Sequence, residues 1–284
     1  IEKDVVISTW QSIYKMPRKY FEQFGCVIGD EAHMFKAKSL TGIMTKLHQC
    51  KYRFGLTGTL DGSQTHKLVL EGLFGAVEKV VSTKELIDKN TLANLKIKCI
   101  VLKHPTKKER MDYAEEINYI VAKESRNNFI LELCNNIGGN TLCLYQLVEK
   151  HGKILYEGMK GSENVYFVYG GTDTEQRERI RGLVEGHSNS TTIASYGTFS
   201  TGINIRNINN IVLASPSKSK IRVLQSIGRG LRISSTKDSI LVFDIADDIS
   251  YGERRNFTLN HFFERINIYN EEQFNYEISK VKIK

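Results

Sequence analysis

Two arginines stand close together in the second half of the chain, in the run Gln225-Ser-Ile-Gly-Arg229-Gly-Leu-Arg232. At about 3.6 residues per turn, Gln225, Arg229 and Arg232 fall on one face of a helix. Two guanidinium groups one turn apart, with no carboxylate between them, repel each other unless an anion lies between them. A phosphate suits that position because guanidinium is a planar, bidentate donor. The alternative is a solvated basic helix end, the commoner meaning of an isolated arginine pair.

Two adjacent carboxylates, Asp30 and Glu31, directly follow the apolar run 26–29 and open the sequence Asp-Glu-Ala-His33. Parallel strands present ligands at their carboxyl ends, so this position suits a metal ion and a water molecule. Phosphoryl transfer from ATP needs a carboxylate to hold Mg²⁺ and a base to orient the attacking water. We expect Asp30 to hold the metal and Glu31 to act as the base. The alternative for Asp30 is a cap on the following helix.

Thr57, Gly58 and Thr59 follow another apolar run, 51–56, about 25 residues after the carboxylates, with a helix expected near 38–49. Taken alone, this tripeptide is only a turn. Its spacing from the carboxylates, with one helix-like segment between them, gives it more weight than the tripeptide has alone.

Near the start of the chain, Val5 to Ser8 is expected to form a short buried strand, followed by Thr9, Trp10 and Gln11. A tryptophan and a glutamine beside a strand end could contact a nucleic-acid backbone. Capping of a short helix by Ser8 or Thr9 is equally compatible with these residues.

Two further segments contain small residues, one in a turn at the end of an expected strand and the other in the stretch 200–204. One includes Gly170, and the other contains Thr201, Gly202 and Asn204. Small residues let a phosphate approach the main chain closely. The alternative for each is an ordinary β-turn.

The elements that position these residues alternate between strand and helix patterns in the second half. Strands are expected at 97–102, 142–146, 165–169, 192–195, 211–214 and 240–245, and helices at 147–160, 173–186 and 218–231. Such alternation predicts a parallel sheet with helical crossovers. A length of 284 residues favours two domains, and the polar stretch 90–95 is the expected boundary.

Composition narrows the class of protein. The chain carries a net charge of +8, which favours a polyanionic partner. Its sequence contains no apolar run of about 18 residues, so no transmembrane span is expected. The five cysteines are odd in number and lack Cys-x-x-Cys spacing, which indicates a reducing compartment without a zinc site.

In their order and spacing, these motifs resemble those of superfamily 2 helicases over nearly the whole chain. Asp30 to His33 matches motif II, the DEAH box, and Thr57 to Thr59 matches motif III. Thr201 to Asn204 lies in the match to motif V, and Gln225 to Arg232 matches motif VI. Within the superfamily, the Thr-Trp-Gln-Ser run at 9–12 and the stretch 195–204 look like the UvsW-type helicases of T-even-like phages.

The resemblance implies an α/β fold of two RecA-like parallel-sheet domains in tandem, residues 1–93 and 94–284, the first incomplete. It implies ATP and Mg²⁺ as cofactors, with Arg229 and Arg232 on the γ-phosphate. Residues implied at the nucleotide are Asp30, Glu31, His33, Gln225, Gly202 and Asn204. Thr57, Gly58 and Thr59 would couple that site to nucleic acid through hydrogen bonds near His33. The residues implied at the nucleic acid are Thr9, Trp10, Gln11, Gly170 and Thr201.

The implied partner is DNA, branched or single-stranded, with RNA–DNA hybrids as a further candidate. The implied activity is ATP-driven translocation that remodels branched recombination intermediates. We expect a monomer without membrane association, in the cytoplasm, or in the host cytoplasm if a phage encodes it.

One departure from the family concerns the phosphate-binding loop. No Gly-x-x-x-x-Gly-Lys-Ser/Thr sequence occurs, and the pair Gly152-Lys153 lies in an expected helix. Since the other motifs are intact, we expect a truncated helicase, inactive alone, with part of its first sheet missing and apolar surface exposed. The alternatives are a nucleic-acid-binding module that never hydrolyses ATP and the motor of a restriction-type translocase.

Overall fold

The computed structural model describes residues 5–35, 37–58, 60, 64–105, 111–202, 205–217, 219–231, 237–252 and 254–284, with only the backbone described for 200–202, 220 and 221. These residues form two compact units, Ile1–Val80 and Val81–Lys284. Among the described residues, no helix is long and apolar enough to cross a membrane.

The first unit is built on a two-stranded parallel sheet, β1 (Cys26–Gly29) and β2 (Tyr52–Gly55), whose strands end level because Gly29 pairs with Gly55. The other elements are α1 (Trp10–Ile13), α2 (Arg18–Phe21), η1 (Ala32–Met34), α3 (Lys38–Lys46) and α4 (Gln64–Phe74). Its core is a single apolar cluster that includes Phe21, Phe35, Leu40, Met44 and Leu70.

The sheet of the first unit is covered on only one face. Ile28 and Phe54, paired across the two strands, are 64% and 53% exposed on the other face. The expected strand at Val5 to Ser8 is wrong: these residues form no strand, and Ile7 is 96% exposed. An apolar run becomes a buried strand only beside a partner edge, and neither β1 nor β2 pairs with this segment.

The second unit contains a seven-stranded sheet in the order β5-β6-β4-β7-β8-β3-β9, with every pairing parallel. The strands are β3 (Asn94–Lys103), β4 (Asn140–Tyr145), β5 (Val165–Val168), β6 (Ser190–Ser195), β7 (Asn210–Leu213), β8 (Ser239–Asp248) and β9 (Tyr276–Lys282). Six of these strands were expected from the sequence, so the predicted parallel α/β architecture is confirmed.

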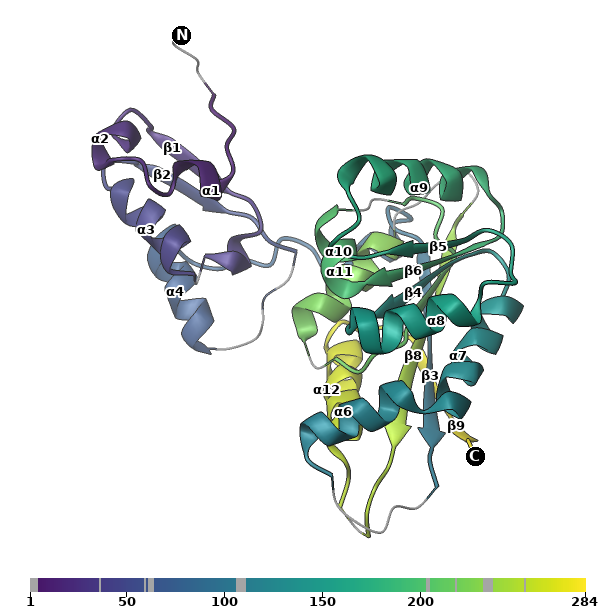
Figure 1. Cartoon of the computed structure of the whole chain (residues 1–284). Helices are drawn as coiled ribbons and strands as arrows, with labels where there is room; N and C mark the ends of the chain where they lie inside the picture. The colour runs from purple at the N-terminus through teal and green to yellow at the C-terminus, as the bar shows by residue number, and fades with distance from the viewer. Residues whose placement is uncertain are drawn as a thin grey trace. The chain divides into compact units, whose positions relative to one another are not determined.

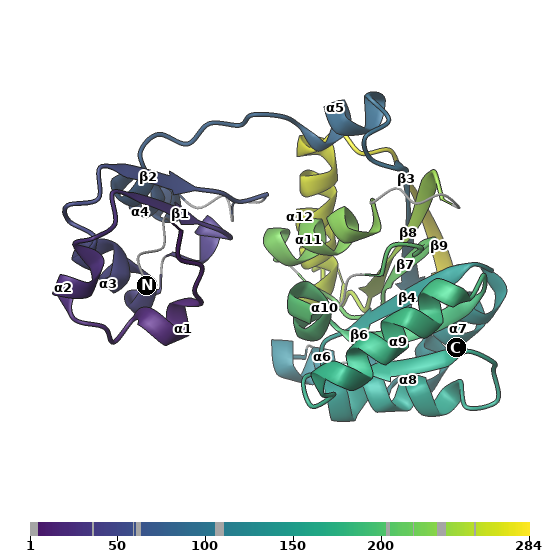
Figure 2. The same ribbon diagram turned by 90° about the horizontal axis from the view of Figure 1, so that it is seen from above.

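Helices cover both faces of this sheet (Figures 1 and 2). One apolar core joins the sheet to α9 (Thr174–Gly186), α10 (Tyr196–Gly202), α11 (Lys220–Gly230) and α12 (Phe257–Glu271). The other core joins it to α7 (Glu124–Asn136) and α8 (Lys153–Gly158). The helix α6 (Tyr113–Ala122) and a π-helical turn, η2 (Val148–Gly152), contact each other and complete the unit.

The division between the units falls earlier in the chain than the 93/94 boundary expected from the sequence. The intervening segment, which contains α5 (Thr83–Asp88), packs with the second unit. Ile87 and Leu92 pack against its core, and the Thr83 hydroxyl donates to a carboxylate oxygen of Glu272 over 3.4 Å. These contacts join residues far apart in sequence, which local composition does not reveal.

Candidate functional site

Asp30 and Glu31 form a tight turn at the carboxyl end of β1. The Glu31 backbone has φ of 50°, in the left-handed region that non-glycine residues seldom occupy. Its N–H donates to the carboxylate of Asp30 over 2.9 Å. Both carboxylates are exposed to solvent. Strained backbone of this kind persists only where its surroundings hold it, and it often marks a functional site.

His33 joins this turn to the segment after β2. Its Nδ1 lies 3.0 Å from Thr57 Oγ1 and 3.2 Å from a carboxylate oxygen of Glu31. The imidazole is buried, whereas Glu31 is about half exposed. The contact that the sequence predicted between the Asp-Glu-Ala-His run and the Thr-Gly segment is therefore present.

Backbone hydrogen bonds fix the same two segments to each other. The Leu56 N–H donates to the Gly29 carbonyl and the Ala32 N–H donates to the Leu56 carbonyl, both over 2.8 Å. A Cβ atom at Gly29 would lie 2.8 Å from the Phe35 ring, closer than real contacts allow. The glycine that ends β1 thus lets an aromatic side chain pack beneath the carboxylates.

In the second unit, α11 carries Gln225 and Arg229. Val223 and Ile227 are completely buried, while Gln225 and Arg229 are partly exposed. The Arg229 guanidinium lies 5.6 Å from the centre of the Phe199 ring on α10, within the range of a cation–π contact.

The two glycines of α11 differ in their surroundings. A Cβ at Gly230 would collide with Ile240 and lie 2.8 Å from Ile211, so this glycine brings the helix close to the sheet. A Cβ at Gly228 would meet nothing within 4 Å. Packing therefore accounts for Gly230, and no contact accounts for Gly228.

The remaining predicted residues are placed as follows. Thr201 and Gly202 end α10, and Gly170 lies in an exposed turn after β5, where its carbonyl accepts from Arg177 over 3.1 Å. Trp10 and Gln11 lie in α1 after Thr9, which makes no side-chain cap. Three predicted residues lie outside the described residues: Thr59, Asn204 and Arg232.

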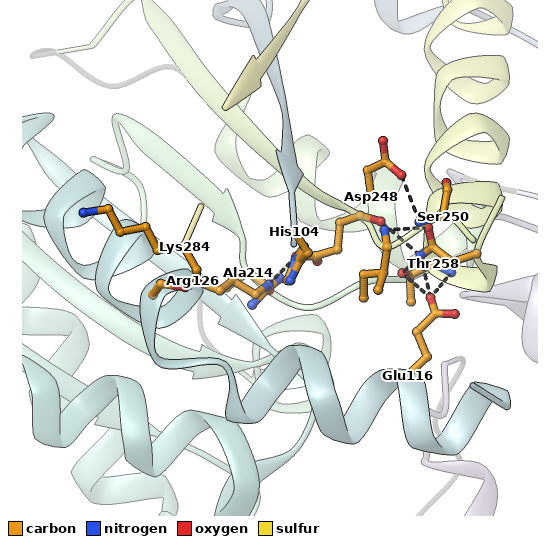
Figure 3. A network of polar contacts seen from close by, with 12 residues as sticks. His104, Glu116, Arg126, Ala214, Asp248, Ser250, Thr258 and Lys284 are labelled. Carbon is orange, nitrogen blue, oxygen red and sulfur yellow. Dashed lines mark hydrogen bonds and ion pairs between the residues drawn. The ribbon is translucent and has the colours of Figure 1, made fainter. Parts of the chain in front are cut away.

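The structure also shows buried ion pairs whose basic partners the sequence did not identify. Asp247, at the end of β8, accepts from His104 over 2.8 Å and from Arg126 over 2.7 Å, and Arg126 donates to the Ala214 carbonyl over 2.7 Å (Figure 3). Arg265 makes a second pair with Asp244. The sequence signal for these ion pairs was the presence of two aspartates within an apolar strand, because a buried charge needs a partner of opposite charge.

These ion pairs set the protonation of the groups around them. Burial alone would raise the pKa of Asp247, but Arg126 and His104 outweigh it and hold that pKa below its ordinary value. Burial, helped by Arg126, lowers the pKa of His151 to about 3. Asp247 is therefore charged and His151 neutral at pH 7.

Two protein-family models match the chain. The helicase conserved C-terminal domain matches residues 125–234, within the second unit. The res subunit of type III restriction enzymes matches residues 1–62, within the first.

Individual proteins match over nearly the whole chain. The ATP-dependent DNA helicase UvsW of Enterobacteria phage T4 is 35% identical over 98% of this chain and 59% of its own length. Its crystal structure matches with a TM-score of 0.59 and 33% identity, over 96% of this chain and 57% of that one. A protein described as an HsdR subunit of a type I restriction enzyme from Vibrio vulnificus matches with a TM-score of 0.72 over 96% of this chain and 51% of that one. At 14% identity, the latter shows the fold alone.

Proposed function

Since the chain belongs to the superfamily 2 helicases, as a relative of UvsW with RecA-like domains, we propose that it is the greater part of an ATP-dependent DNA translocase that remodels branched DNA. The chain spans 59% of the length of T4 UvsW, so the activity of the whole protein belongs to this proposal. Recombination, repair and replication are the proposed settings.

The observation that carries the proposal is the arrangement of Glu31, His33 and Thr57. His33 contacts the side chains of both Glu31 and Thr57. The contacts lie just beyond the carboxyl ends of β1 and β2, which are side by side in the sheet. In this role Glu31 orients the attacking water, and the buried His33 links it to the Thr57 segment. A change at the nucleotide thereby reaches the part of the unit that responds to DNA.

Mg²⁺ and ATP fit the residues at this edge. Mg²⁺ prefers oxygen ligands and is commonly held by one or two carboxylates together with substrate phosphates. Asp30 is exposed at the strand end and suits that role. When bound, the ion would neutralise charge that develops on the transferred phosphoryl group.

The second unit would supply positive charge and backbone contacts to the nucleotide. Arg229 and Arg232 would stabilise charge on the γ-phosphate, and Gln225 would contact the nucleotide from the same helix. Gly202 and Asn204 would contact it from the segment after β6. In related phosphoryl transfers, a single arginine supplied in this way raises the rate by a factor of about 10³ to 10⁵.

DNA is the proposed partner, and the net charge of +8 supports a polyanion. Thr9, Trp10 and Gln11 would contact its backbone from the first unit, and Gly170 and Thr201 from the second. These contacts are to the backbone, so binding should not depend on sequence. We propose that the protein acts as a monomer in the cytoplasm of the cell that contains it.

The phosphate-binding loop is the part of the machinery that these 284 residues do not contain. We propose that sequence beyond them supplies it, and that residues 1–284 alone do not turn over ATP. A module that binds DNA without hydrolysing ATP is the alternative if no such loop exists.

A second candidate is the motor of a restriction-type translocase. The match of residues 1–62 to type III restriction subunits favours it. A nuclease or methyltransferase domain encoded in the same gene would support this candidate over a recombination helicase.

The test is remodelling of a model replication fork by a protein that joins residues 1–284 to a phosphate-binding loop. We expect ATP-dependent strand displacement that is lost in Arg229→Ala, with Arg206→Ala as the matched control on an exposed arginine. Binding of the fork without ATP-dependent displacement would contradict the proposal and favour the non-hydrolysing module.

A further inference from the structure

A cavity of about 330 Å³ opens beside the carboxyl ends of β4 and β7, within the second unit. One wall is α6, which contributes Ala114 near the start of the helix and Ile117 one turn later. Leu147 and Pro216, which follow the two strands, provide further apolar lining. A volume of this size lies within the usual range of about 300–1,000 Å³ for small-molecule sites.

This cavity lies where the chain reverses direction across the sheet. β4 and β7 are neighbours, but β4 leads to β5 on one side of the sheet and β7 leads to β8 on the other. Such a switch point leaves a crevice outside the carboxyl ends of the two strands, and open parallel sheets bind ligands there. The position therefore indicates a binding site independently of any motif.

The floor of the cavity offers one hydrogen-bond donor. Ser215 Oγ accepts from the Gln146 N–H over 3.1 Å and lies 2.9 Å from His151 Nδ1. His151 Nε2 lies 3.5 Å from Arg126, which can only donate, so Nε2 accepts and Nδ1 carries the hydrogen. Ser215 Oγ thus accepts twice, and its own hydrogen has no recorded acceptor in the described part of the chain.

The floor is also rigid. Arg126, which fixes the orientation of His151, is itself held by Asp247 and by the Ala214 carbonyl (Figure 3). Ser215 is only 4% exposed. A donor fixed in this way needs no reorganisation when a ligand arrives.

Two basic side chains lie beside the cavity. Lys150 Nζ donates to Asn118 over 2.9 Å, and Arg222 donates to Gln146 over 3.4 Å. No ion pair with a carboxylate is recorded for Lys150 or Arg222 among the residues described. Lys153, one turn beyond Lys150, is instead paired with Glu149 over 2.7 Å. The charge around the cavity therefore suits an anionic ligand.

We propose that this cavity receives one unstacked base of a single DNA strand, whose phosphates lie on Lys150 and Arg222. Apolar walls suit the faces of a base, and every base carries an acceptor on its edge for the Ser215 hydroxyl. Recognition of this kind depends on the presence of a base and not on its identity. The proposal rests on the DNA-binding function proposed above and adds a site for the base to the backbone contacts.

The test compares binding of an oligothymidine strand and of an abasic strand of equal length to the 284-residue chain, measured by fluorescence anisotropy. Ala114→Trp fills the cavity from an exposed position, and Ala122→Trp, on an exposed position of the same helix outside the cavity, is its control. We expect Ala114→Trp to weaken oligothymidine binding by about tenfold, which corresponds to 1.4 kcal/mol. Binding of the abasic strand should not change, and Ala122→Trp should behave as wild type.

The cations are tested separately with Lys150→Gln, for which the paired Lys153→Gln is the control. Lys150→Gln should weaken binding of both strands and reduce the slope of log affinity against log salt by about 0.7. Lys153→Gln should leave that slope unchanged. Equal salt slopes in the two variants would show that Lys150 does not contact a phosphate. That result would contradict the proposed placement of the strand.

The outcomes separate this inference from the proposed function. If wild type binds DNA but Ala114→Trp and Ala122→Trp behave alike, the base site is wrong and the DNA-binding function remains. If Ala114→Trp abolishes binding of thymidine monophosphate but not of the strand, the site belongs to a free nucleotide and the proposal is overturned. If wild type binds neither strand, the proposed function fails as well.

Discussion

His33 Nδ1 lies 3.0 Å from Thr57 Oγ1, so a buried imidazole joins the turn after β1 to the segment after β2. The same nitrogen lies 3.2 Å from Glu31, the proposed base. Glu31 and Thr57 therefore share one contact partner. The structure provides a short physical connection between the residue proposed to act on the nucleotide and the segment proposed to sense DNA.

Removal of the Thr57 hydroxyl should uncouple ATP hydrolysis from the binding of DNA. In a protein that carries residues 1–284 with a phosphate-binding loop, Thr57→Val should keep basal ATP hydrolysis and lose most of its stimulation by DNA. Thr57→Ser retains the hydroxyl that faces His33 and should retain the stimulation. The measurement is phosphate release with and without DNA. Equal stimulation in the valine and serine variants would show that the contact does not couple the sites.

Asp30 and Glu31 should differ in what they contribute. Glu31→Gln removes the proposed base but keeps the metal ligand, so Mg²⁺-ATP should still bind while hydrolysis falls by at least about 10². Asp30→Asn should weaken binding of Mg²⁺-ATP as well. Equilibrium binding of a fluorescent ATP analogue, with Mg²⁺ varied, separates the two effects in the loop-bearing protein. A rate of ATP hydrolysis in Glu31→Gln equal to that of the wild type would show that this carboxylate is not the base.

The first unit should unfold before the second. Ile28 and Phe54 leave one face of its two-stranded sheet exposed, whereas helices cover both faces of the seven-stranded sheet. Trp10, the single tryptophan of the chain, lies in the first unit, so its fluorescence reports that unit alone. In urea, the fluorescence transition should precede the main circular-dichroism transition. Coincident transitions would mean that the two units unfold together.

His151 should make the second unit sensitive to mild acid. Its pKa is about 3 in the folded protein, because of burial and Arg126, and about 6.5 in an unfolded chain. Between these values only the unfolded chain binds the proton, so stability falls as the pH decreases, by up to about 1.4 kcal/mol per pH unit. His151→Gln should show a shallower decrease in unfolding free energy between pH 7 and pH 5. Parallel pH profiles for the two proteins would contradict the buried neutral imidazole.

The sequence predicted the elements whose pattern is local and apolar. The strands around Cys143 and Val242 contain the continuous apolar runs 142–145 and 240–243, separated by helical patterns, which is typical of a buried parallel sheet. The edge strand β9 and the helix α12 were not predicted. The residues of β9 are mostly exposed and include Glu277, Lys280 and Lys282, because the strand has only one neighbour in the sheet. The apolar run at Val5 shows the opposite case, since its pattern is strand-like but its segment pairs with neither β1 nor β2.

The candidate site also contains some features that the sequence predicted and others that it did not. The contact between His33 and Thr57 was expected from the resemblance, because the run that begins at Thr57 matches a helicase motif that makes hydrogen bonds near His33. The left-handed backbone of Glu31 and the pairing of Asp247 with Arg126 were not predictable. Both depend on contacts between distant segments, and no local pattern in the sequence encodes them.

The central claim is that residues 1–284 hold the base and the arginines of an ATP-driven motor but not its phosphate cradle. Phosphate release with saturating DNA and Mg²⁺-ATP tests it most directly, on the chain alone and joined to a phosphate-binding loop. The loss of an arginine finger alone costs about 10³ to 10⁵ in rate, and loss of the whole cradle should cost no less. We predict no turnover by the chain alone, and DNA-stimulated turnover by the joined protein that Glu31→Gln abolishes. Clear turnover by the chain alone that disappears in Glu31→Gln would contradict this account.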